Sequence, residues 1–133
     1  MENDRACPNL STLNILTRYF FLRVNERLSF LRYGKGNFFR AHTDGQPNLP
    51  DGRKARVTIQ IYLGDDGVEG GATRILSTNT KYFDVEPKKG RVLIFQQRGI
   101  YHSGEEVTKG VKYTLRTDFL FRQILDEQGC TSV

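Results

Sequence analysis

The stretch ARVTIQIYL, residues 55–63, decides the fold class, because its side chains alternate between apolar and polar. Successive side chains of a β-strand point to opposite faces, so this alternation is typical of a strand with one apolar and one polar face. The apolar face would carry Val57, Ile59, Ile61 and Leu63. The polar face would carry Thr58, Gln60 and Tyr62.

More strands are predicted on both sides of this stretch. The segment VKYTLRTDFLFR (111–122) alternates in the same way. Shorter runs rich in β-branched and aromatic residues are LRYG (31–34), ATRIL (72–76), KYFDV (81–85) and RVLIF (91–95). Turn-forming residues fill GDDGVEGG (64–71) and EPKKG (86–90). Short strands with no helices between them indicate two packed antiparallel sheets or a barrel.

The polar strand faces allow two arrangements. In a two-sheet sandwich they would meet solvent, and the composition favours this arrangement. In a barrel with a polar ligand in its mouth, Lys112 and Tyr62 would point inward instead. Alternation alone does not distinguish the two.

The N-terminal segment STLNILTRYFFLRVNE (11–26) has a different period. Its apolar residues recur every three or four positions, which predicts one face of a helix, with Ser11 as N-cap. The residues on that face are Leu13, Leu16, Phe20 and Val24.

Length and composition predict one soluble domain, residues 1–133. The net charge of +5 comes from basic residues spread along the chain, so nucleic acid is only a minor option as a partner. Cys7 and Cys130 do not form a disulfide framework, and no apolar run reaches the roughly 20 residues that span a bilayer. An intracellular location, in cytoplasm or nucleus, is therefore expected, and the oligomeric state is not predicted.

Residues 40–45, RAHTDG, contain one of the chain's two histidines, His42, two positions before Asp44. A His-x-Asp triplet alone is more often an ordinary surface pair. On a strand, however, both side chains project from one side, and His102 from a later strand could complete a triangle. Two imidazoles and one carboxylate on one face of a metal is the arrangement of non-heme iron(II) oxygenases.

Three longer segments carry a resemblance to a known family: RYGKGNFFRAHTDG (32–45), RVTIQIYLGDDGVEGGATRI (56–75) and VEPKKGRVLIFQQRGIYHSGEEVTKGVKYTLRTDFLF (85–121). Together they resemble the prolyl 4-hydroxylase-like branch of the iron(II) and 2-oxoglutarate-dependent dioxygenases. The resemblance covers about residues 28–122. It implies a mainly β fold, a double-stranded β-helix or jelly roll following the N-terminal helix. It also implies Fe(II), 2-oxoglutarate and O2 as cofactors, with ascorbate as an optional reductant.

The resemblance also implies roles for single residues. His42, Asp44 and His102 would be the metal ligands. Lys112, ten positions after His102, would bind the distal carboxylate of 2-oxoglutarate. Arg116 is the second candidate for this role; it shares the strand face of Lys112 but lies about 13 Å further along, so one carboxylate cannot meet both.

Other residues match family positions with smaller roles. Tyr62 and Tyr33 match tyrosines whose hydroxyls contact the cosubstrate. Gly70, Gly71 and Thr73 match the family's turn into the next strand. The chain departs from the pattern at Glu106, where relatives often have proline, and at Phe39, where they often have tyrosine.

The resulting functional hypothesis is a dioxygenase that hydroxylates a C–H bond of a protein, peptide or small-molecule substrate, a peptidyl proline being one candidate. The segment after Asp44, residues 45–54, would be an irregular lid over the substrate entrance. Two alternatives stay open. One is a zinc hydrolase with Glu105 or Glu106 as general base, and the other is a catalytically silent jelly-roll binding module.

Overall fold

The computed structural model describes residues 18–64, 67–77 and 80–124, and within these ranges every regular element is a β-strand. The larger sheet has five strands, of which four follow the order β1, β11, β4 and β8, while the fifth, β2, pairs with the first half of β11. Their bounds are β1 Arg18–Val24, β2 Ser29–Tyr33, β4 Lys54–Leu63, β8 Val92–Gln96 and β11 Lys112–Ile124.

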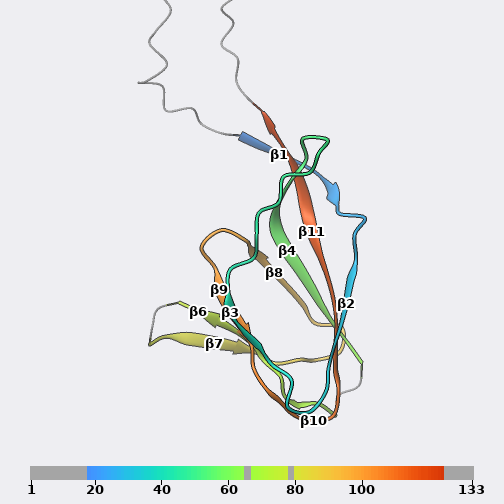
Figure 1. Ribbon diagram of the computed structural model, residues 1–133, viewed down its shortest axis with the longest axis vertical. Helices are drawn as coiled ribbons and strands as arrows, with labels where there is room; N and C mark the ends of the chain where they lie inside the picture. The colour runs from blue at the N-terminus through green and yellow to red at the C-terminus, as the bar shows by residue number, and fades with distance from the viewer. Residues whose placement is uncertain (1–17, 65–66, 78–79, 125–133) are drawn as a thin grey trace, which may run out of the picture.

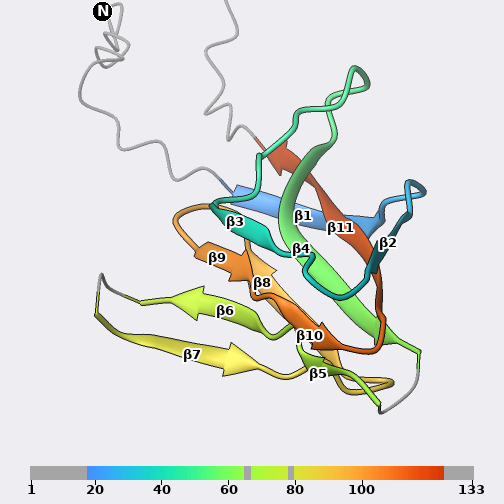
Figure 2. The same ribbon diagram turned by 60° about the horizontal axis from the view of Figure 1, so that its bottom comes forward.

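The smaller sheet faces the larger one across the domain (Figures 1 and 2). Its order is β3 (Phe39–His42), β9 (Tyr101–Gly104), β6 (Thr73–Leu76) and β7 (Tyr82–Val85). A two-stranded ribbon of β5 (Glu69–Gly70) and β10 (Val107–Lys109) lies at one end. All strand pairs are antiparallel, and the fold is the predicted double-stranded β-helix. No helix among the described residues is long and apolar enough to span a bilayer.

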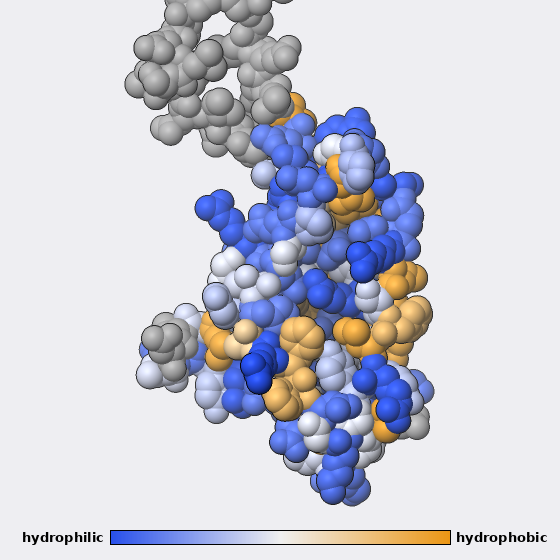
Figure 3. Space-filling view, viewed as in Figure 1, coloured by the Kyte–Doolittle hydropathy of each residue, from blue (hydrophilic) through white to orange (hydrophobic). Residues whose placement is uncertain are grey.

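The polar faces of the larger sheet point into the domain. Thr58, Tyr62 and Thr114 are each 1% exposed, and Lys112 is 4% exposed. The opposite face carries exposed apolar side chains, of which Phe30 is 72% and Ile94 54% exposed. Figure 3 shows such apolar groups interspersed with polar ones over the visible surface. The barrel arrangement is therefore correct, and the sandwich with outward polar faces is wrong.

The helix expected over residues 11–26 is wrong for Arg18–Val24, which form strand β1. Residues 11–17 lie outside the described part of the chain. Strand β11 is 13 residues long, and its second half extends past β2. The backbone N–H and C=O groups of that half need another partner strand, and β1 provides it. The aromatic sequence of β1 suits this position, since Phe21 packs edge-on against Phe119 and Phe121, at 5.3 and 5.8 Å between ring centroids.

Residues 45–54 form the expected irregular loop, which contains a hydrogen-bonded turn. The amide of Leu49 donates to the carbonyl of Arg53 at 2.7 Å, and the amide of Ala55 to the carbonyl of Pro47 at 3.0 Å. The turn leads from β3 into β4 and projects beyond the sheets (Figure 2). Asp44 is thus followed by a hydrogen-bonded segment.

Gly70 is required where β5 meets β10. Its φ of 72° is in the left-handed region, and a Cβ built there would lie 2.4 Å from the carbonyl oxygen of Glu106. A side chain at this position would therefore meet both backbone strain and backbone atoms that cannot move aside easily.

We expect Gly70→Ala to destabilise the domain more than Gly90→Ala. Gly90 has a similar φ of 79° but open space where its Cβ would lie. Gly90→Ala should cost about 1–2 kcal/mol from the left-handed backbone alone. Gly70→Ala should cost roughly 1–3 kcal/mol more because of the added steric overlap. Urea unfolding of both variants measures the difference, and equal losses would contradict the close approach.

Candidate active site

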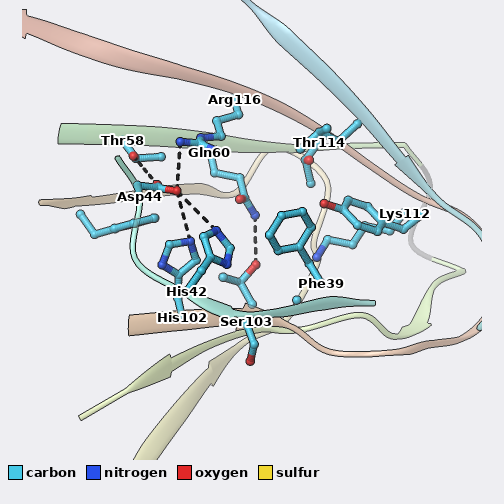
Figure 4. A pocket seen from close by; sticks show the side chains of 15 residues that line it. Phe39, His42, Asp44, Thr58, Gln60, His102, Ser103, Lys112, Thr114 and Arg116 are labelled. Atoms are coloured by element: carbon cyan, nitrogen blue, oxygen red, sulfur yellow. Dashed lines mark hydrogen bonds and ion pairs between the residues drawn. The ribbon is translucent and has the colours of Figure 1, made fainter. Parts of the chain in front are cut away.

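The three candidate metal ligands lie together at one end of the cavity between the sheets (Figure 4). Strands β3 and β9 pair so that His42 and His102 are direct partners, with ring centroids 4.4 Å apart. Asp44 Oδ1 lies 3.5 Å from Nε2 of His42 and 3.7 Å from Nε2 of His102. One ligand atom from each of the three residues lies within 4.8 Å of the others, a spacing that one metal ion could bridge.

Both histidines present the nitrogen that a metal needs. Nδ1 of His42 lies 2.8 Å from the carbonyl oxygen of Arg40, and Nδ1 of His102 lies 3.2 Å from that of Ile100. A carbonyl only accepts, so Nδ1 carries the proton and Nε2 is left with a lone pair facing Asp44. Burial also lowers the pKa of His102, which favours its neutral form.

Asp44 is held through both carboxylate oxygens. Its Oδ2 accepts a hydrogen bond of 2.6 Å from the hydroxyl of Thr58, and its Oδ1 lies 3.0 Å from Nη2 of Arg116. The carboxylate is nearly inaccessible, with 2% of the side chain exposed. Arg116 therefore lies at the metal-ligand end of the cavity.

Lys112 lies at the other end of the cavity (Figure 4). Its ammonium donates to the carbonyl of Gly71 at 2.6 Å and lies over the rings of Tyr33 and Tyr62, at 5.2 and 5.7 Å. Among the described residues, no carboxylate forms an ion pair with it. Burial lowers its pKa to about 8. A buried cation of this kind is costly without a counter-ion, and an anionic ligand would supply one.

The cavity wall beside Lys112 has a second unsatisfied group. The hydroxyl of Thr114 is buried and has no hydrogen-bond partner within the described part of the chain. Thr114 is two residues from Lys112 on β11, so both side chains face the cavity. One ammonium and one free hydroxyl donor match the needs of a carboxylate.

The two tyrosines differ in their contacts. The hydroxyl of Tyr62 donates to the hydroxyl oxygen of Thr73 at 2.7 Å, and Thr73 also accepts from the amide of Gln60 at 3.0 Å. Tyr33 lines the cavity at the Lys112 end, and burial raises its pKa. Thr73, expected only at a turn, is thus a buried part of the cavity wall.

Several residues at this site did not emerge from the sequence as site residues. Phe39 packs on the ring of His42 and Phe95 on that of His102, with centroid distances of 4.5 and 4.7 Å. Gln97 is 1% exposed and donates to Asp118 at 2.8 Å. Alternation continued one residue past the end of β8 would place Phe95 and Gln97 on one face, but it does not say that this face is internal.

A sequence model of a known family matches most of these elements. The model describes the 2OG-Fe(II) oxygenase superfamily and matches residues 28–119. The chain belongs to this superfamily. As the family's description states, its cofactors are Fe(II) and 2-oxoglutarate. The His-Asp-His cluster fits the metal, and the buried Lys112 with the free Thr114 hydroxyl fits a carboxylate of 2-oxoglutarate.

Solved structures of similar fold include three prolyl hydroxylases. The Pseudomonas putida prolyl-4-hydroxylase has a TM-score of 0.55 and 24% identity, over 69% of this chain and 50% of that one. The Trichoplax adhaerens prolyl hydroxylase, in complex with a hypoxia inducible factor peptide, has a TM-score of 0.61 and 19% identity, over 76% of this chain and 46% of that one. The collagen prolyl hydroxylase of Paramecium Bursaria Chlorella virus-1, in complex with 2OG, has a TM-score of 0.55 and 23% identity, over 79% of this chain and 61% of that one.

At sequence identities of 19–24%, the similarity to these structures shows a shared fold alone. This 2OG-Fe(II) oxygenase chain spans about half the length of these structural relatives. No curated protein matches the chain.

We expect Lys112→Met to stabilise the ligand-free oxygenase at neutral pH. The pKa of Lys112 is about 8 in the folded chain, against 10.5 for an ordinary lysine, so the cost of burying its charge is fully present at pH 7. Methionine removes that cost, and the free energy of unfolding should rise by about 1–3 kcal/mol. Between pH 8 and 10.5 the unfolded chain binds more protons, so the native protein gains stability and the difference should shrink.

Guanidinium unfolding at pH 7 and at pH 9.5 measures this effect. Lys109→Met is the matched control, because Lys109 is exposed and pairs with Glu69 at the surface. A Lys112→Met variant that is less stable than wild type at pH 7 would show that the ammonium is well compensated without a ligand.

Proposed function

We propose that this chain is the catalytic domain of a 2-oxoglutarate-dependent dioxygenase that hydroxylates a C–H bond of its primary substrate. The observation that carries the proposal is the pairing, in one cavity, of a His-Asp-His cluster with a buried lysine that forms no ion pair with any described carboxylate. With Fe(II), 2-oxoglutarate and O2 bound, the metal would supply oxygen activation coupled to decarboxylation, which yields succinate, CO2 and hydroxylated substrate.

Each end of the cavity has its own task in this proposal. Nε2 of His42, Nε2 of His102 and Oδ1 of Asp44 would hold the metal on one side and leave other positions for ligands. Lys112 and Thr114 would bind the distal carboxylate of 2-oxoglutarate through an ion pair and a hydrogen bond. Arg116 lies at the metal end, so it is not placed to share that carboxylate with Lys112.

The primary substrate would lie in a second groove of about 730 Å³ that shares Arg116 with the metal cavity. A space of this size is typical of a ligand site. Its wall comes from three segments: the chain between β1 and β2, the turn after Asp44, and the middle of β11 (Asn25, Arg27, Ser29, Gly45, Gln46, Pro47, Leu49, Arg116, Thr117 and Asp118). The turn at 45–54 would thus form one side of the substrate groove.

A prolyl residue in a peptide is the substrate we favour. Three of the solved structures of similar fold are prolyl hydroxylases, and one of them was solved with a peptide. An open groove formed by three chain segments suits an extended peptide better than a small molecule, which a closed pocket would surround. Apolar contacts from Pro47 and Leu49 would suit a proline ring.

The zinc hydrolase alternative lacks a free general base. Glu105 accepts from the hydroxyl of Ser103 at 2.7 Å and pairs with Arg74 at 3.0 Å. Glu106 is exposed and does not line the cavity. The cavity therefore suits an oxygenase better than a hydrolase.

We expect the chain to convert 2-oxoglutarate to succinate only when Fe(II) and O2 are both present. The assay measures succinate while proline-containing peptides are varied, and a true substrate should raise succinate release and gain 16 mass units. His42→Ala and His102→Ala are the controls for loss of the metal. No succinate under any condition, with one metal ion bound per chain, would favour the binding module.

We expect Lys112→Ala to weaken 2-oxoglutarate binding by about ten- to a hundredfold, because it removes a charge-assisted contact of roughly 1.5–3 kcal/mol. Calorimetry without O2, at saturating Mn(II), measures this affinity apart from turnover. Arg116→Ala is the comparison and should have a much smaller effect. If the two effects are exchanged, Arg116 is the anchor; if neither variant changes the affinity, the cosubstrate assignment is wrong.

A further inference from the structure

A chain of buried polar groups leads from Asp44 into the larger sheet. The hydroxyl of Thr58 donates to Oδ2 of Asp44 at 2.6 Å, and the amide nitrogen of Gln97 donates to that hydroxyl at 3.3 Å. The same nitrogen donates to Oδ1 of Asp118 at 2.8 Å. Thr58 and Gln97 are each 1% exposed, so water cannot replace these contacts. We call Thr58, Gln97 and Asp118 the relay.

Strand register holds the relay in place. Thr58 on β4 lies directly opposite Asp118 on β11 and Phe95 on β8. Gln97 follows β8, and its backbone amide donates to the carbonyl of Arg56 at 2.9 Å. Thr58 and Asp118 therefore lie on neighbouring strands, and Gln97 lies directly after β8, the strand on the other side of β4. The relay is a rigid support behind Asp44.

The direction of each hydrogen bond follows from the groups at the two ends. An ionised carboxylate only accepts, so Thr58 must donate to Asp44 and can then only accept from Gln97. Gln97 must also present its nitrogen to Asp118. Its carbonyl oxygen Oε1 is buried and accepts no hydrogen bond from any residue that the structure describes. Turning the amide over would place that oxygen against two acceptors, so the observed orientation is the favourable one.

We propose that Thr58, supported by Gln97, is a positioning residue for Asp44. By holding Oδ2, Thr58 fixes the rotation of the carboxylate so that Oδ1 faces Nε2 of both histidines. Arg116 contacts Oδ1 as well, but its side chain is 34% exposed and lies at the open groove. The inference rests on the proposed metal site and assigns to Thr58 and Gln97 a role that the ligand set alone does not contain.

The test is metal affinity, which is independent of turnover. Co(II) is titrated into the full chain without 2-oxoglutarate, and binding is followed by calorimetry and by the visible d–d spectrum. Thr58→Val keeps the shape of the side chain but removes the donor. We expect about ten- to a hundredfold weaker Co(II) binding, as for other partners that orient metal ligands, and a changed spectrum.

Two further variants separate positioning from general damage. Thr58→Ser keeps the hydroxyl and should restore affinity and spectrum. Gln97→Met removes the support but leaves Thr58 free to donate, so it should weaken Co(II) binding less than Thr58→Val does. Gln97→Met also provides a second test of the relay if Thr58→Val fails to fold.

Thr114→Val is the matched control. Thr114 is equally buried on the same inner face, and its hydroxyl makes no hydrogen bond to residues 18–64, 67–77 or 80–124. This variant should bind Co(II) as wild type does and lose affinity for 2-oxoglutarate instead. Thermal unfolding of each ligand-free variant reports on folding.

The outcomes separate the two proposals. Wild-type Co(II) affinity in Thr58→Val, or an equal loss in Thr114→Val, would overturn the positioning role while leaving the metal site intact. Failure of the wild-type chain to bind one Co(II) ion would instead overturn the proposed function.

Discussion

Burial of the Asp44 carboxylate is the interaction on which the arrangement of this domain depends. A carboxylate inside a protein must be surrounded by donors, or its burial costs several kcal/mol. Asp44 receives them from two strands of the opposite sheet, Thr58 on β4 and Arg116 on β11. The inward-facing polar side chains of the barrel bring these groups together. The inward polar faces and the two facing sheets thus both serve to surround the buried Asp44 carboxylate with donors.

The buried polar groups at the two ends of the cavity differ in how many hydrogen-bond and ion-pair partners they have. At one end each oxygen of Asp44 has a donor, so the candidate metal ligands are held in place before any ion binds. At the other end, none of the described residues gives Lys112 a carboxylate partner or the hydroxyl of Thr114 a hydrogen bond. The domain therefore combines an organised end with an end that an anion would complete. Such a division suits a site in which a metal and an anionic cosubstrate must meet in one orientation.

The sequence predicted the strands well and their environment only in part. Alternation gave 55–63 for a strand observed at Lys54–Leu63, because side-chain period is a local property. It could not say which face is internal, since the same alternation fits a strand with its polar face inside the domain and a strand with its apolar face inside. The helix prediction over 11–26 was wrong for Arg18–Val24 because a spacing of three or four also fits an aromatic strand, and the deciding partner, β11, lies about a hundred residues away.

The candidate metal ligands and the groups that orient them also differ in how far sequence could reveal them. His42 and Asp44 are neighbours along the chain, and their spacing with His102 is a recognisable pattern even though β3 and β9 have only four residues each. Thr58, Gln97 and Asp118 form no pattern, because strand register brings them together from three separate segments. Each of the three would pass as an ordinary polar residue of a strand or its end. A motif can therefore name the atoms that would touch a metal, whereas the hydrogen bonds that aim those atoms become visible only in the folded chain.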